Sequence, residues 1–240
     1  SASSAQPSTN NQFSSIIFAA KDLTILAPNV NLLNAGSISS GGQLSISAYD
    51  LTNAGKIITN DELRITSLGS LTNTGNISSA GNAQLATGNF LSNQGIIYSN
   101  GQLSISSYQL TNSGTLYSAS NFNIAITSDL TNQGTIYSNY ELGITNYENK
   151  GNANIIGANL LAKDIVLNID GNLLLQSKQN LLESDFYSVG ANVGISGGGP
   201  QGGGLNGASV GFNTADGFQS RAWVDQITSI VGTNSVAINT

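Results

Sequence analysis

Apolar and polar residues alternate along most of the chain, in short runs that are separated by Gly and Asn. The run QLSIS begins at Gln43 and occurs again from Gln102, with an apolar residue at every second position. A period of two predicts β-strands that bury one face. No apolar pattern recurs at 3.6 residues, and the many Gly, Ile, Thr and Asn residues disfavour helices. The pattern therefore predicts an all-β protein.

The alternating runs belong to a repeat of about twenty residues. LTNAGKIIT begins at Leu51, LTNTGNISS at Leu71 and LTNQGTIYS at Leu130. Each repeat contains an Asn-x-Gly turn. An apolar residue, mostly Leu or Ile, recurs four residues before its glycine and two, eight and ten residues after it. The turn glycines are Gly36, Gly55, Gly75, Gly95, Gly114, Gly134 and, more weakly, Gly151. The turn asparagines are Asn34, Asn53, Asn73, Asn93, Asn112, Asn132 and Asn149.

Units of this length cannot bury a hydrophobic face alone, whereas a stack of them buries a continuous core. We therefore expect a parallel β-helix (a solenoid) with three short strands in each coil and about 4.8 Å between coils. Asn tolerates the left-handed turn geometry next to Gly, and stacked side-chain amides can form a hydrogen-bonded ladder. The asparagines are interpreted as structural. This register places Ala153 in the same column as Ile136.

The pattern changes along the chain and suggests four regions. Residues 1–30 form a polar leader and an irregular first coil, and residues 31–151 form the regular repeats. Residues 152–183 read as divergent coils without the Asn-x-Gly turn. In residues 184–240, the segments Val189–Ile195 and Asn206–Phe212 are similar to each other and predict a β-hairpin around a Gly-rich link. The final NSVAINT resembles the start of a further coil, so we expect the natural protein to continue.

Composition narrows the functions. The chain has 7 Lys and Arg against 13 Asp and Glu, and a net charge of −6, which argues against nucleic acid as a partner. It contains no His and no Cys, so the commonest metal ligand and general base are missing. We expect no metal and no cofactor. No apolar run reaches the length of a transmembrane helix.

Carbohydrate-binding or carbohydrate-active β-helix proteins are the main alternative, and they need carboxylates on neighbouring coils. Glu62 and Glu141 share a column but lie four coils apart, about 19 Å at the usual strand spacing. A glycosidase pair needs roughly 5–9.5 Å. Asp61 and Glu62 point to opposite sides if the chain is extended there. We therefore predict a non-enzymatic protein without catalytic residues.

Three tyrosines form one candidate binding strip. Tyr98, Tyr117 and Tyr137 follow the turn glycine by three residues in consecutive repeats, so they are expected on the outer face at about 4.8 Å spacing. Stacked rings can simply stabilise the order of the coils. A flat aromatic strip could instead bind a glycan or a partner protein. Tyr140 lies near the next corner and could extend the strip.

The LTNxGxIxSxGxLxIxS repeat, from Asn31 to about Gly151, resembles the haemagglutinin repeats of filamentous haemagglutinin-like exoproteins. The stretch from Gln176 to Ile195 and the Gly-rich link after it look like a second repeat class of such proteins. The resemblance implies secretion through an outer-membrane two-partner secretion transporter to the surface of a Gram-negative bacterium. It also implies a virulence-related filament that acts as an adhesin, or as the stalk of a contact-dependent growth inhibition protein that delivers a toxin. The expected partner is a protein or glycan on the target cell.

Overall fold

The computed structural model describes residues 10–13, 16–146, 151–197 and 205–240. Every regular element in these ranges is a β-strand. The chain forms two compact units, one from Ser1–Lys178 with Gln226–Thr240 and the other from Gln179–Asp225. The first unit is a parallel β-helix, and the second contains a two-stranded sheet. The predicted fold class is confirmed.

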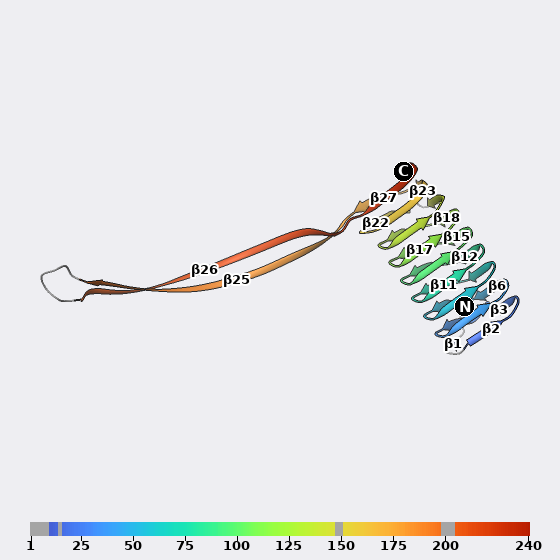
Figure 1. Cartoon of the computed structure of the whole chain (residues 1–240), viewed down its shortest axis with the longest axis horizontal. Coiled ribbons are helices and arrows are strands. Elements are labelled where there is room, and N and C mark those ends of the chain that lie inside the picture. Colours follow the sequence, from blue (N-terminus) through green and yellow to red (C-terminus); the bar gives the residue numbers. More distant parts are fainter. Residues whose placement is uncertain (1–9, 14–15, 147–150, 198–204) are drawn as a thin grey trace, which may run out of the picture. The chain divides into compact units, whose positions relative to one another are not determined.

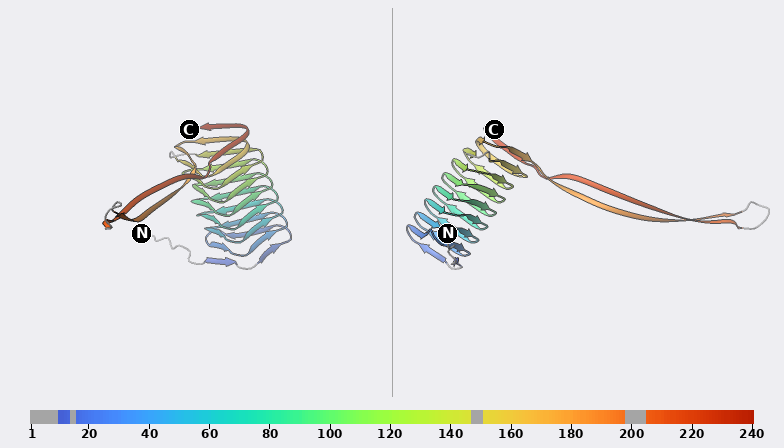
Figure 2. Two further views of the ribbon diagram at one scale, coloured as in Figure 1. Left: turned by 60° about the vertical axis from the view of Figure 1, so that its left-hand side comes forward. Right: turned by 180° about the vertical axis from the view of Figure 1, so that it is seen from behind.

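Each regular coil contains three strands. The coils stack on one another (Figures 1 and 2). One coil consists of β4 (Asn31–Asn34), β5 (Ser37–Ser40) and β6 (Leu44–Ala48). The next strand, β7 (Leu51–Asn53), pairs in parallel with β4 and starts the next coil. Successive coils therefore hydrogen-bond through three columns of strands.

The column of first strands continues below and above β4 and β7. Its other members are β1 (Asn10–Phe13), β10 (Leu71–Asn73), β13 (Phe90–Asn93), β16 (Gln109–Asn112), β19 (Leu130–Asn132), β22 (Ala153–Ile156) and β24 (Leu173–Gln176).

The columns of second and third strands join into one sheet through β23 (Asn159–Ile169), which pairs with the last strand of each column. The second strands are β2 (Ile16–Ala19), β5, β8 (Lys56–Thr59), β11 (Asn76–Ser79), β14 (Ile96–Ser99), β17 (Thr115–Ser118) and β20 (Thr135–Ser138). The third strands are β3 (Leu23–Ala27), β6, β9 (Leu63–Ser67), β12 (Ala83–Thr87), β15 (Leu103–Ser107), β18 (Phe122–Ile126) and β21 (Glu141–Asn146).

The core is a set of apolar columns that run through the stack. Leu51, Ile57 and Leu63 represent one coil, and all three are almost completely buried. Each stacks on an apolar residue of the next coil. The register pairs Leu51 with Leu71, Ile57 with Ile77 and Leu63 with Ala83. A short strand thus buries its inner face against the coils on both sides.

The turn asparagines form a buried hydrogen-bonded ladder. Asn34, Asn53, Asn73, Asn93, Asn112 and Asn132 are each 0% exposed. The Nδ2 of each of the first five donates to the Oδ1 of the next asparagine, over distances from 2.6 to 2.8 Å. Asn93 Nδ2 also approaches the carbonyl oxygens of Gly95 and Thr115, both at 3.2 Å. The ladder therefore satisfies the turn of one coil and the backbone of the next.

The turn glycines are required by the close packing of backbones and not by a left-handed backbone conformation. Among the described glycines, positive φ is found at Gly157, with φ 55. At Gly95, an added Cβ would lie 2.0 Å from the carbonyl oxygen of Gly75 in the coil below. Stacked turns leave no space for a side chain on that side.

The predicted register holds through β21 and fails in the coil that begins with β22. Ala153 pairs with Leu130 and Ile155 with Asn132, whereas Ile136 pairs with Leu160. The physical reason is a longer coil, since 23 residues separate Asp129 from Asn152, whose backbone amide it binds. Gly151 therefore precedes the first strand of its coil instead of following it. Asn149 lies outside the described residues, and Ile155 occupies the position above Asn132.

The predicted hairpin is longer than expected and replaces a turn. β25 (Lys178–Gly197) and β26 (Leu205–Gln226) form a two-stranded sheet. After them, β27 (Ser229–Asn239) returns to the β-helix and pairs in parallel with β23. In a regular coil, an Asn-x-Gly turn joins the first strand to the second. The hairpin stands at this place between β24 and β27. Here Thr228 closes the corner, because its Oγ1 donates to the Gln176 carbonyl (2.6 Å) and its amide to Ser177 Oγ (3.2 Å).

We predict that Asn93→Ala destabilises the β-helix, because it leaves the amide of Asn73 and the turn carbonyls without their partner. Each buried polar group left unpaired costs roughly 1–3 kcal/mol. The midpoint of urea unfolding should fall clearly. Asn123→Ala is the control, because Asn123 is exposed in the neighbouring sheet, and its midpoint should stay near that of the wild type. Equal midpoints for the two variants would contradict the role given to the ladder.

A second prediction tests whether glycine is needed at the turns because of close backbone packing or because of its flexibility. Gly95→Ala should destabilise the fold by more than about 1 kcal/mol, because the new Cβ would meet backbone that cannot move independently. Gly143→Ala should be tolerated, since a Cβ there would meet only Asn123 Oδ1, at 3.2 Å. Thermal unfolding of both variants measures the difference. If both substitutions cost the same, the packing explanation is wrong.

Candidate functional site

The candidate strip of tyrosines lies on the outer face of β14, β17 and β20. The register pairs Tyr98 with Tyr117 and Tyr117 with Tyr137. The ring centroids are 4.9 and 5.1 Å apart, with interplanar angles of 5° and 15°. The three side chains are half-buried. The structure therefore brings these three residues together as one stack.

This stacking determines which part of each ring can meet a partner. Both faces of the Tyr117 ring are covered by its neighbours, so the stack presents ring edges and hydroxyl groups. The hydroxyls of Tyr98 and Tyr117 donate to Asn100 Oδ1 (3.2 Å) and Asn139 Oδ1 (3.4 Å). A sugar ring would need an open aromatic face. The stack is better suited to the mixed polar and apolar contacts that tyrosines make at protein interfaces.

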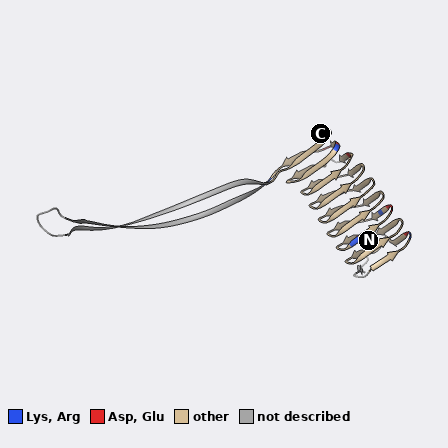
Figure 3. Cartoon of the chain, in the orientation of Figure 1, with Lys and Arg blue, Asp and Glu red and all other residues tan. Residues whose placement is uncertain are grey.

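The stack adjoins a long section of β-helix that has no charge. No Lys, Arg, Asp or Glu occurs between Arg64 and Asp129, and the coils of this section are uniformly tan in Figure 3. Several exposed large apolar residues fall within it, namely Leu68, Phe90, Ile96 and Tyr108. This part of the surface can approach another molecule without desolvating an ion, which lowers the cost of contact.

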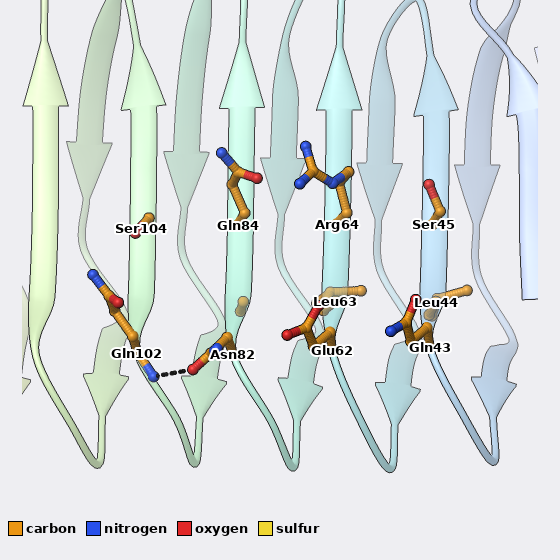
Figure 4. A pocket seen from close by; sticks show the side chains of 11 residues that line it. Gln43, Leu44, Ser45, Glu62, Leu63, Arg64, Asn82, Gln84, Gln102 and Ser104 are labelled. Carbon is orange, nitrogen blue, oxygen red and sulfur yellow. Dashed lines mark hydrogen bonds between the residues drawn. The ribbon is translucent and has the colours of Figure 1, made fainter. Parts of the chain in front are cut away.

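A polar groove of about 430 Å³ lies on the outer face of the third-strand column (Figure 4). Its lining includes Gln43, Glu62, Asn82 and Gln102 at the corners, and Ser45, Arg64, Gln84 and Ser104 on the strands. The groove offers amides, hydroxyls, one carboxylate and one guanidinium. Asn82 Oδ1 already accepts a hydrogen bond from the backbone amide of Gln102, at 2.8 Å. The groove can hydrogen-bond to a polar molecule but contains no paired carboxylates.

The carboxylates considered for catalysis are placed apart. Glu62 lines the groove, and Glu141 begins β21, with the coils of β12, β15 and β18 between them. The longer coil instead brings Glu141 opposite Asp164 of β23, a neighbour that the sequence register did not predict. In the part of the chain that the structure describes, no group of three or more His, Cys, Asp or Glu residues could hold a metal ion.

Asp164 binds the returning strand β27. Its Oδ1 accepts hydrogen bonds from Ser235 Oγ and Asn234 Nδ2, both at 2.6 Å. The hydroxyl of Ser235, then the amide of Asn234, lower the pKa of Asp164 below its ordinary value. A carboxyl group held in the ionised form is a poor general acid at neutral pH. Asp164 therefore has a structural role, which is to hold β27 against β23.

Two sets of structural side chains were missed by the sequence reasoning. Corner residues bridge adjacent coils, as where Asp50 Oδ1 accepts from the amide of Ser70 (2.8 Å) and Asp129 Oδ1 from that of Asn152 (2.9 Å). Their signal was weak, because Asp and Asn interchange at different corners. The second set is a buried hydroxyl column, four residues after each turn glycine, of Ser40, Thr59, Ser79, Ser99, Ser118 and Ser138.

The asparagine ladder lies just before the second strands, and the hydroxyl column lies at their other end. The hydroxyls, like the asparagines, hydrogen-bond to backbone carbonyls of two adjacent coils. Ser99 Oγ lies 2.8 Å from the carbonyl oxygen of Gly81 and 3.1 Å from that of Gln102. It therefore serves the corner of its own coil and that of the coil below. The recurrence of Ser or Thr at this position was visible in the sequence and could have revealed the column.

These features define the chain as a β-solenoid protein whose regular surface carries little charge. The model of the haemagglutinin repeat family matches residues 8–75, 47–146 and 148–182. The chain belongs to this family, and it is a filamentous haemagglutinin-like repeat segment, as its resemblance indicated. Such repeats are typical of structural, surface-associated adhesins. No curated protein and no solved structure matches the chain. Among the described residues, no helix is long and apolar enough to cross a membrane.

Asp164 leads to a prediction about pH. The pKa of Asp164 is lower in the folded protein than in the unfolded chain. Its hydrogen bonds therefore stabilise the docking of β27 fully when the pH is above the pKa that Asp164 has in the unfolded chain. This contribution is lost as the pH falls through the folded pKa. The NMR signals of Ser235 and Asn234 should therefore show a transition below the ordinary range for Asp. Asp164→Asn keeps an acceptor oxygen and should abolish the transition. If the pH midpoint of this transition in the wild type lies at or above the ordinary pKa of Asp, Asp164 is not the group responsible.

Proposed function

We propose that this chain is a non-enzymatic segment of a large secreted filament on the surface of a Gram-negative bacterium. The observation that carries the proposal is the unbroken register of the stack from β4 to β21. Each coil adds about 4.8 Å of length at the cost of about twenty residues, and every coil is bonded to the next through three strands. Such a stack is long for its number of residues and rigid, and both properties suit a stalk. The family membership supports passage through an outer-membrane two-partner secretion transporter as part of this proposal.

Within this filament, Tyr98, Tyr117 and Tyr137 are proposed as a contact strip for a target cell. Support comes from their position beside the uncharged section and from the hydroxyl groups at the ring edges. Because the ring faces cover one another, a surface protein is a better partner than a glycan for this strip. The stalk would then serve adhesion, or hold a target cell close while a toxin is presented.

The test is binding of the labelled chain to Gram-negative bacteria and to epithelial cells. We expect saturable binding to one of them, which would distinguish an interbacterial carrier from a host adhesin. Replacing Tyr98, Tyr117 and Tyr137 by Ser should reduce binding strongly, because it removes the aromatic contact area. The thermal unfolding of this variant should show that the stack is still folded.

A matched control replaces three large apolar or aromatic residues outside the uncharged section, Phe18, Leu26 and Tyr49, by Ser. This control should bind like the wild type. Unchanged binding after loss of the three stacked tyrosines would remove them as a contact strip. A wild-type chain that binds neither cell type would reject recognition by this segment and leave only the role of spacer.

A further inference from the structure

The hairpin has two unpaired edges. β25 and β26 pair with each other, and neither pairs with another strand among the described residues. Each strand therefore has one row of backbone N–H and C=O groups without a strand partner. Such an edge is a template for a further strand.

The length of the hairpin makes this exposure unusual. β25 has 20 residues and β26 has 22, whereas strands usually have about 5–6 residues. An isolated two-stranded hairpin is at best marginally stable in water, and a third or fourth strand is normally needed. The hairpin therefore gains stability if its edges are paired.

The outer half of the hairpin lacks the charged residues and prolines that commonly prevent edge pairing. Proteins usually protect an edge with Lys, Pro, a bulge or a short strand. The segments 186–197 of β25 and 205–215 of β26 contain no charged residue and no Pro. The charged residues of the two strands are all in the other half, and they are Lys178, Glu183, Asp185, Asp216, Arg221 and Asp225.

The charge distribution favours a second copy of this chain as the partner. The chain has a net charge of −6, so two copies repel each other when they approach along charged surfaces. The outer half of the hairpin is neutral and avoids this repulsion. It also has no charge with which to select a basic or acidic partner, whereas a second hairpin offers an edge of the same length.

We propose that the outer half of this hairpin pairs edge to edge with the hairpin of a second copy, forming a joined sheet of at least four strands. Backbone hydrogen bonds would supply the contact, as in other cases of strand addition. This association goes beyond the proposed stalk function, because it links one filament to another. It does not depend on the tyrosine strip.

The experiment measures the oligomeric state of the full chain by light scattering, across a wide range of protein concentration. The wild type should change from monomer to dimer or larger species as concentration rises. A variant with Asn192, Ser196, Ser209 and Asn213 replaced by Lys should remain a monomer, because like charges opposite each other oppose strand pairing. The control variant carries four Lys on the β-helix, at the exposed positions of Gln84, Gln94, Thr111 and Asn123, and should associate like the wild type.

Hydrogen exchange keeps the test valid if the four lysines also disrupt the hairpin itself. In the wild type, amides of β25 or β26 should gain protection as concentration rises, while those of the β-helix should not change. A wild-type chain that stays monomeric at every concentration would overturn the proposal. So would association that persists in the hairpin variant, or protection of the hairpin that does not depend on concentration.

Discussion

The stacking of one strand on the next, at about 4.8 Å, is the constraint on which the rest of the structure depends. At this distance the inner face of each coil is covered only if the coil above carries similar residues at the same positions. Apolar residues therefore stack on apolar residues through the regular coils, for example Leu51 on Leu71 and Ile57 on Ile77. The same spacing excludes a side chain at the turn glycines, whose backbones nearly touch those of the coil below.

Polar groups inside the stack obey the same constraint. An asparagine amide has both donors and an acceptor, so a column of asparagines can satisfy itself as well as the turns beside it. The column of Ser and Thr does the same for the next corner. The ladder ends at Asn132, where Ile155 and then Leu175 follow in the column. Beyond that point the corner changes, first to the positive φ of Gly157 and then to the insertion of the hairpin.

The surface of this protein is built from amides, hydroxyls and a few aromatic residues. Acidic side chains such as Asp50, Asp129 and Asp164 bind backbone or side-chain donors of neighbouring strands, so they stabilise the stack. The features left for recognition are the tyrosine edges, the uncharged section and the polar groove. Each of them extends over several neighbouring coils, because residues at the same position of successive coils lie side by side.

The sequence by itself determined the fold, the order of the regular coils and the inward or outward direction of most of their residues. It could do so because a fixed repeat combined with alternation leaves one stacking register for residues such as Leu51, Leu71 and Leu91. Only the tertiary structure showed that the tyrosine rings cover one another, because ring orientation depends on side-chain angles that alternation does not specify. It also decided the register from β22 onward, where a longer coil breaks the repeat and places Ile155 over the ladder. Finally, it showed that β27 returns to β23 around the hairpin, a pairing between distant segments that local patterns cannot determine.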